Sequence, residues 1–511
     1  MIDIGTLNPE QREAVETIRG PVLILAGAGT GKTRVITYRI AHMIERGVSP
    51  NNILGVTFTN KAAREMQGRV RKLIPKIKDE DGKLLKPTIC TFHSLCVRVL
   101  RQHIEKLGYK KNFVIYDEAE QVSVVRKILS SISTGKESKG DPRAILSLIS
   151  KYKNKGSFEG LGDENLNAMA QIVSRKYNSA LKACNAVDFD DLIVLTLQLF
   201  REHEDALGAC QAKYRFVMVD EYQDTNSTQF ELMNALTKEH RNLCVVGDDD
   251  QSIYGWRGAE VANLLDMEKH YPDVKVVKLE QNYRSTNTIL DAANAVIRNN
   301  VQRRGKTLWS AMGKGESICM NPYQSDEEEA REVVEEIEFN RLTKRIPWKS
   351  HAILFRTNLQ SRPIEMELRK QQVKYNLIGG QSFFDRREIR DFLAFLKMLM
   401  NPHDDVSLLR IANAPARGLS NVTMERLLAA SQERSCSVFT AMRHSDVQES
   451  FRKGAREAIE IFLELIEETR AALEEEGASE EPAALEKWAK KFISEIGYMN
   501  EIRRMEKNEE T

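Results

Sequence analysis

The chain has 511 residues, which at roughly 100–200 residues per domain allows about two to five domains and excludes a single small fold. Hydrophobic residues make up 41% of the chain and charged residues 29%, a balance that supports packed cores and excludes disorder as the main state. The net charge of +1 conceals an asymmetry, because residues 451–511 carry 16 acidic against 10 basic side chains, a net of −6, and residues 1–450 a net of +7. This mildly basic body with an acidic tail permits a polyanionic partner without requiring one.

The sequence lacks the signals of membrane insertion and of secretion. No apolar run approaches the ~20 residues of a membrane span, and the first residues, MIDIGTLNPEQ, have no basic region followed by an apolar one. The seven cysteines are scattered and never spaced as Cys-x-x-Cys, which is typical of free thiols rather than of a zinc or disulfide framework. We therefore expect a cytoplasmic protein that does not bind a membrane.

Short apolar, β-rich runs alternate with helical patterns in two parts of the chain. Strands are predicted at residues 22–26, 53–58, 88–92, 216–219, 243–246 and 274–279. Between about residues 113 and 200 helical periodicity replaces the strand pattern, which predicts one parallel-sheet α/β domain interrupted by a helical insertion. A second α/β stretch, with strands predicted at 318–323 and 352–355, is followed by helical sequence after about Arg386.

The segment AGAGTGKT lies between a predicted strand and a helical run, which is the context of a phosphate-binding loop. Its glycines let backbone N–H groups turn onto phosphate oxygens, Lys32 is expected to reach the β- and γ-phosphates, and the Thr33 hydroxyl is expected to bind Mg²⁺. A dinucleotide-binding fingerprint is the rival interpretation, but the spacing is GxGxG and a Lys-Thr pair follows. The residues expected to cradle the phosphates are Ala26, Gly27, Ala28, Gly29, Thr30, Gly31, Lys32 and Thr33.

A phosphate-binding loop needs a carboxylate at the end of a neighbouring strand to hold the metal. Two acidic pairs compete for this role, Asp117-Glu118 and Asp220-Glu221. The second pair is favoured because it ends the stronger strand, whereas the first is expected to open a helix. Asp220 would then hold Mg²⁺, and Glu221 would orient and deprotonate the attacking water.

The segment VVGDDDQSIYGWRGA combines acids at a strand end with a glutamine, two aromatic residues and an arginine. Gln251 is suited to sense a γ-phosphate because its amide both donates and accepts hydrogen bonds. Tyr254, Trp256 and Arg257 are suited to stack on the bases of a single strand. The alternative is that the two aromatic residues belong to the core, which the polar neighbours disfavour.

On these segments, in this order, the chain resembles the UvrD/Rep/PcrA family of superfamily 1 DNA helicases over nearly all of residues 5–424. AGAGTGKT is similar to the family's own phosphate loop, which accounts for Ala26. LNPEQREAV resembles the segment in which a glutamine, here Gln11, reads the adenine edge. LEQNYRST resembles the segment in which Tyr283 would stack on adenine and Arg284 would reach the γ-phosphate across a domain cleft.

The resemblance also implies a track for single-stranded DNA. VTFTNKAAREM, TFHSL and FRTNLQSR look like DNA-contacting segments, DFDDL like the end of the helical insertion, and GGQSFFDRREIRDF like a second-domain segment. For His93 a capping or core role is the alternative. Lys151, Lys153 and Lys155 could touch duplex DNA, but a solvated loop is the more common fate of such lysines. The residues implicated in DNA contact are Phe58, Asn60, Thr91, His93, Tyr254, Trp256, Arg257, Arg356 and Asn358.

The fold that the resemblance implies is α/β, with two RecA-like P-loop domains built on parallel sheets, the second incomplete, each carrying a helical insertion. Domain 1A would comprise residues 1–110 and 200–280, 1B residues 111–199, 2A residues 281–385 in part, and 2B residues 386–511, incomplete. The implied activity is ATP- and Mg²⁺-dependent 3′–5′ movement on single-stranded DNA and at single-strand/duplex junctions, with unwinding in repair or replication.

Two further family segments have no counterpart in these residues, a T-x-H-x-x-K-G-L-E-F-like motif and one ending in TRA that supplies a second arginine. Thr469-Arg470-Ala471 matches the latter only superficially, since no apolar strand precedes it. We therefore expect a fragment or short form that binds ATP but hydrolyses it slowly. An ATP-gated module that binds DNA or docks a partner is the alternative.

Overall fold

The computed structural model describes residues 2–132, 141–156, 164–378, 386–434, 436–477 and 482–505. The chain forms two compact units, one of Met1–Glu316 with Phe395–Glu501 and one of Ser317–Ala394 with Ile502–Thr511. Among the described residues, no helix is both long enough and apolar enough to span a bilayer. All seven cysteines are free thiols, as predicted.

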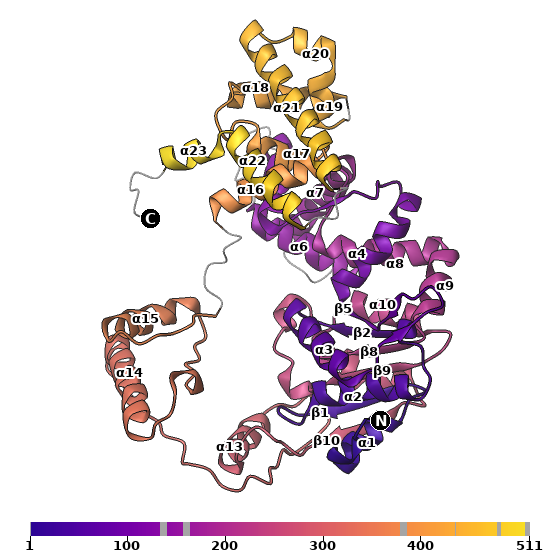
Figure 1. Ribbon diagram of the computed structural model, residues 1–511, viewed down its shortest axis with the longest axis vertical. Helices are drawn as coiled ribbons and strands as arrows, with labels where there is room; N and C mark the ends of the chain where they lie inside the picture. The colour runs from indigo at the N-terminus through magenta and orange to yellow at the C-terminus, as the bar shows by residue number, and fades with distance from the viewer. Residues whose placement is uncertain are drawn as a thin grey trace. The chain divides into compact units, whose positions relative to one another are not determined.

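The larger unit is built on a six-stranded parallel sheet with the strand order β10-β1-β9-β8-β2-β5 (Figure 1). β1, β2 and β9 are buried along their whole length, which agrees with their nearly continuous apolar sequences. The six predicted strands are confirmed, with small shifts at their ends. Their bounds are β1 Val22–Ala26, β2 Ile53–Thr57, β5 Thr88–Thr91, β8 Phe216–Val219, β9 Leu243–Gly247 and β10 Lys275–Leu279.

Helices cover both faces of this sheet. Alternate residues of a strand point to opposite faces, so Ile24 packs in one core cluster while Leu23 and Leu25 pack in the other. The first face is covered by α1 Pro9–Glu16, α2 Lys32–Glu45 and α3 Asn60–Leu73; the second by α4 Phe92–His103, α8 Phe189–Glu202 and α10 Ser227–Thr237. The shorter elements are β3 Ile77–Lys78, β4 Leu84–Leu85, α9 Glu204–Lys213, α11 Ala262–Leu265, α12 Met267–His270 and α13 Asn287–Ile297.

A helical segment interrupts the α/β part between β5 and β8. It contains α5 Glu118–Ile132, α6 Pro142–Lys155 and α7 Glu164–Ala183, and a short parallel pair, β6 Val114–Ile115 with β7 Ala186–Val187, lies at its two ends. The carboxylate of Asp117 accepts a hydrogen bond from the backbone N–H of Glu120 at 2.9 Å, directly before α5. The prediction that the first acidic pair opens a helix is therefore confirmed.

Lys153 differs from the sequence-based expectation of a solvated lysine. It lies in α6, four residues after the buried Ile149, so the helical repeat brings it to the buried face. Its Nζ lies 2.7 Å from Asp188 Oδ2 and 2.6 Å from Asp191 Oδ1. Burial by itself would lower the pKa of Lys153, but the two carboxylates outweigh it and raise the pKa.

The sequence after Arg386 is helical in the described residues, as expected. The helices are α16 Arg387–Met400, α17 Asp405–Ile411, α18 Asn421–Glu433, α19 Val438–Arg443, α20 Ser445–Glu449, α21 Lys453–Gly477, α22 Pro482–Glu495 and α23 Tyr498–Met505. Lys397 of α16 forms an ion pair with Glu120 of α5 at 2.6 Å, so α16 contacts the helical segment.

The smaller unit contains α14 Asp326–Thr343 and α15 Ser361–Lys370. The strands predicted at 318–323 and 352–355 are wrong for the described structure, because neither segment belongs to any of its sheets. Met320 and Leu354 are 91% and 94% exposed. An apolar run becomes a strand only where a neighbouring strand satisfies its backbone groups, and sequence pattern alone does not supply that neighbour. Residues 379–385 of the segment GGQSFFDRREIRDF lie outside the described residues.

We expect Lys153→Ala to lower the free energy of unfolding by about 3–5 kcal/mol, because it leaves two buried carboxylates without their cation. Lys151→Ala, which removes an exposed lysine from the same helix, is the matched control and should change it by less than about 0.5 kcal/mol. Urea unfolding followed by circular dichroism measures both. Equal effects of the two substitutions would contradict the structural role of Lys153.

Candidate nucleotide and DNA site

The predicted site residues of the larger unit collect at one edge of the sheet. Because all six strands are parallel, their carboxyl ends share that edge, where ligands of open α/β sheets bind. Apart from Gln11, which lies in α1, the nucleotide candidates lie at the ends of four adjacent strands, β10, β1, β9 and β8. Of the DNA candidates, Phe58 and Asn60 follow β2, and Thr91 and His93 lie at the end of β5.

The phosphate loop connects β1 to α2 and is held by residues 282–284. Gly29 and Gly31 have φ angles of +71° and +91°, which favour glycine. The Asn282 side chain donates a hydrogen bond to the carbonyl of Ala28 at 2.6 Å, and the Tyr283 backbone N–H donates to the carbonyl of Gly29 at 2.9 Å. The loop and the segment with Tyr283 and Arg284 are thus in direct contact.

Gln11 contacts this loop through its side chain. It is 1% exposed, and its side-chain N–H donates to the carbonyl of Thr30 at 2.8 Å. Its side-chain oxygen accepts from the backbone N–H of Asn8 at 3.3 Å, as part of a capping box at the start of α1. Both ends of the amide therefore hold the loop and the helix, and reading of adenine by Gln11 stays a prediction. Tyr283, which is predicted to stack on adenine, is 48% exposed, and this stacking stays a prediction.

The two acids after β8 have different environments. Asp220 is 5% exposed; burial and then the neighbouring Glu221 raise its pKa to about 6, against a smaller lowering by Lys32. Glu221 has a left-handed φ of +53°, an uncommon conformation for a residue with a side chain. Its carboxylate lies 2.7 Å from the Nζ of Lys32. The lysine of the phosphate loop and the favoured catalytic acid are therefore brought together.

The donor types of Asp220 and Thr33, the two residues expected to hold the metal, suit Mg²⁺. Carboxylate and hydroxyl oxygens are suitable ligands for this ion, and Thr33 is the second residue of α2. Burial disfavours the Asp220 anion, so a divalent cation would relieve that penalty. The acids Asp248, Asp249 and Asp250 also lie close together, but Lys306 forms ion pairs with all three, so this cluster does not fit a metal.

The aromatic residues after β9 are exposed. Trp256 is 69% and Tyr254 39% exposed, and their ring centroids are 6.4 Å apart. The core alternative for these two residues is therefore wrong, while stacking on bases stays a prediction. The side chain of Arg257 lies outside the described residues.

Of the other DNA candidates, some have side chains in contact with neighbouring residues of the fold and others lie at exposed positions. The Thr91 hydroxyl caps α4 by accepting from the backbone N–H of Ser94 at 3.2 Å. The ring of His93 packs against Phe189 at 5.7 Å, and burial lowers its pKa although Asp190 opposes this. Phe58 packs edge-on against Phe92, with ring centroids 5.6 Å apart. Exposed positions are held by Asn60 and, in the smaller unit, by Arg356 and Asn358.

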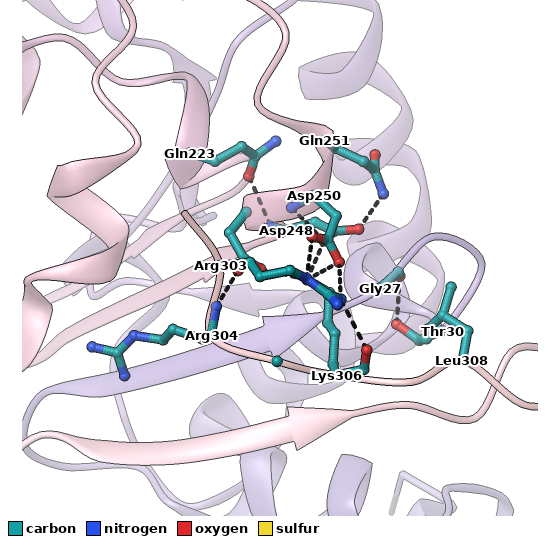
Figure 2. A network of polar contacts seen from close by, with 12 residues as sticks. Gly27, Thr30, Gln223, Asp248, Asp250, Gln251, Arg303, Arg304, Lys306 and Leu308 are labelled. Carbon is teal, nitrogen blue, oxygen red and sulfur yellow. Dashed lines mark hydrogen bonds and ion pairs between the residues drawn. The ribbon is translucent and has the colours of Figure 1, made fainter. Parts of the chain in front are cut away.

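Gln223 is a site residue that the sequence analysis missed. Its side-chain N–H donates to Glu221 Oε2 at 3.0 Å, and its side-chain oxygen accepts from the backbone N–H of Asp248 at 2.9 Å. Asp248 Oδ2 in turn accepts from the Gln251 amide at 2.5 Å (Figure 2). Gln223 therefore joins the acids after β8 to the turn after β9. Its place in DEYQD, two residues after Glu221, was the available signal.

Comparisons with known proteins cover both halves of the chain. Residues 7–272 match the family described as UvrD/REP helicase N-terminal domain, and residues 277–510 match the UvrD-like helicase C-terminal domain. The chain is 42% identical over 470 residues to the ATP-dependent DNA helicase PcrA of Staphylococcus aureus strain Mu50 and to that of Staphylococcus epidermidis strain RP62A. Each alignment covers 91% of this chain and 63% of the relative, so the chain spans less than two thirds of their length.

We expect Gly29→Ala to weaken ATP binding at least about tenfold, because the new Cβ would lie 2.5 Å from Asn282 Nδ2 and 2.9 Å from Arg284 Cβ. Gly20→Ala is the matched control: its φ is +79°, but its Cβ would meet nothing within 4 Å. Both variants should lose about 1–2 kcal/mol of stability from the left-handed φ. Titration with a fluorescent ATP analogue measures the difference, and equal affinities of the two variants would count against this geometry.

Proposed function

Because the chain belongs to the UvrD/REP helicase family, we propose that it binds ATP with Mg²⁺ at the carboxyl edge of its sheet and couples hydrolysis to movement along DNA. The observation that carries the proposal is the Lys32–Glu221 ion pair beside the phosphate loop. It joins the phosphate-binding lysine to the acid that would activate water. Asp220 and Thr33 would hold the magnesium ion, which neutralises charge on the transferred phosphoryl group when bound.

The ion pair implies an order of events in the site. When the γ-phosphate enters, Lys32 exchanges Glu221 for phosphate oxygens, and the released carboxylate becomes available to accept a proton from the attacking water. Arg284, carried by the segment that contacts Gly29, would stabilise charge that develops on the phosphate. Gln251 would sense the γ-phosphate from the turn after β9.

For the nucleic acid we propose single-stranded DNA, including the single strand at a junction with duplex, with 3′–5′ movement and unwinding. The exposed Tyr254 and Trp256 support a stacking surface that accepts any base. The strand order supports coupling, because β8, with the catalytic acids, pairs directly with β2, which is followed by Phe58 and Asn60. Binding of this kind weakens as salt rises, since phosphate contacts release counterions.

A second candidate function is an ATP-gated module that binds DNA or docks a partner without full motor activity. It rests on the expectation that Arg284 is the first cleft arginine of the family and that the second has no counterpart in these residues. In this case ATP would bind but turn over slowly. The two candidates differ in whether single-stranded DNA accelerates hydrolysis.

We expect Glu221→Gln to lower the rate of ATP hydrolysis at least about 100-fold, because the amide cannot accept the proton of the attacking water. ATP affinity should be unchanged or higher, since Lys32 loses its competing partner. Glu231→Gln, which removes an exposed acid paired with Arg201, is the control and should keep the wild-type rate.

The measurement is ATP turnover with and without single-stranded DNA, together with ATP affinity. Turnover that DNA stimulates and that requires Glu221 supports the motor, whereas tight ATP binding with slow, unstimulated turnover supports the gated module. Failure of the wild-type chain to bind ATP would overturn both.

A further inference from the structure

A cluster of charged side chains, most of them buried, lies beside the phosphate loop, and the function proposed above assigns no role to its central lysine. Its centre is Lys306, whose side chain is 4% exposed and whose Nζ forms ion pairs with Asp248, Asp249 and Asp250. The distances to Asp248 Oδ1 and Asp250 Oδ2 are 2.7 and 2.8 Å. The ammonium group has three N–H donors, and each of the three carboxylates accepts one of them.

The same chain segment supplies further contacts to this turn. The Arg303 guanidinium binds both oxygens of Asp250, at 2.9 and 2.8 Å, and the backbone N–H of Arg304 donates to Asp249 Oδ2 at 2.6 Å. All three carboxylates after β9 are thus held by residues 303–306. Figure 2 shows Asp248 and Asp250 beside Arg303 and Lys306. A buried charge cluster is costly unless every member is paired, so its position is closely defined.

Asp248 links Lys306 to the nucleotide residues, through its carboxylate to Gln251 and through its backbone N–H to Gln223. Asp248, held by Lys306 through Oδ1, accepts the Gln251 amide on Oδ2. The backbone N–H of Asp248 donates to Gln223, and Gln223 donates to Glu221, the partner of Lys32. Lys306 therefore orients the Asp248 carboxylate that accepts the hydrogen bond from the Gln251 amide.

The segment that carries Lys306 also touches the phosphate loop itself. A Cβ on Gly27 would lie 2.2 Å from the Leu308 side chain, so Leu308 packs directly on the loop (Figure 2). The backbone of Trp309 then pairs with the segment after β10, accepting from Asn282 N–H at 2.7 Å. Residues 303–309 thus form one strap that contacts the turn after β9, the phosphate loop and residues 280–282.

We propose that Lys306 is a positioning residue for γ-phosphate recognition: it fixes the Asp248 carboxylate so that the Gln251 amide is presented in one orientation. The proposal rests on the proposed function, because it assumes that Gln251 senses the γ-phosphate of bound ATP. It assigns to the strap a role in distinguishing ATP from ADP. The phosphate loop and Lys32 would contact ATP and ADP alike, so Lys306 would affect only the contact of Gln251 with the γ-phosphate.

The experiment compares the affinities of the full chain for Mg²⁺–AMP-PNP and Mg²⁺–ADP, measured by calorimetry. Lys306→Met alone leaves the buried Asp248 and Asp249 and the partly buried Asp250 with one cation, Arg303, and would cost stability. The test variant is therefore Lys306→Met/Asp249→Asn, which removes one charge of each sign and keeps the contact of Asp248 with Gln251. Gln223→Leu removes the acceptor of the Asp248 backbone N–H without changing any charge and serves as a second variant.

We expect Lys306→Met/Asp249→Asn to reduce the preference for AMP-PNP over ADP about tenfold, with ADP affinity within about twofold of wild type. Gln251→Ala should reduce the preference equally. Combining it with the Lys306→Met/Asp249→Asn pair should cause no further loss, because both changes act through one contact. Lys153→Met/Asp191→Asn removes a comparable buried pair that shares no residue with these hydrogen bonds and should leave the preference unchanged.

An unchanged preference in both the Lys306 and Gln223 variants, while wild type binds both nucleotides, overturns the inference alone. Equal losses for AMP-PNP and ADP, or losses that add to that of Gln251→Ala, also overturn it, because they would indicate a purely structural cluster. Wild-type chain that binds neither nucleotide overturns the proposed function and the inference together.

Discussion

The parallel pairing of the six strands is the constraint on which the rest of the site depends. It places every carboxyl strand end at one edge, and the crossover order then decides which loops are neighbours. The phosphate loop lies between the segment after β10, with Arg284, and the turn after β9, with Gln251. The acids after β8 stand next to the candidate DNA loop after β2. Adjacency of strands therefore gives a short physical route between the two candidate sites.

Three lysines of this structure pair with carboxylates, and the number and exposure of these carboxylates indicate different roles for the lysines. Lys153 and Lys306 are almost fully buried, each with more than one carboxylate, which suits fixed positions because breaking such a cluster is costly. Lys32 has one acidic partner, Glu221, whose side chain is 36% exposed. A pair of this kind can separate at lower cost, as exchange of Glu221 for a phosphate requires.

Much of the fold could be predicted because the signals are local. The strand before Asp220 was distinguished from the run before Asp117 by its unbroken apolar residues; Asp220 directly follows β8, and α5 begins directly after Asp117. The phosphate loop was defined by its glycines and by the strand and helix on either side. In contrast, residues 318–323 and 352–355 have apolar sequences without strand neighbours, and pattern alone could not indicate this.

The family, the strands of the larger sheet and the residue types at its carboxyl edge can be inferred from the sequence alone, because periodicity and motif spacing act between residues close in the chain. The support of the phosphate loop by Gln11, the burial of Lys153 and the contact of Lys306 with the turn of Gln251 become visible when the chain is folded. Those roles depend on which distant residues meet. A lysine or glutamine has the same sequence pattern whether it faces water or a buried carboxylate, and the packing of the surrounding elements makes that choice.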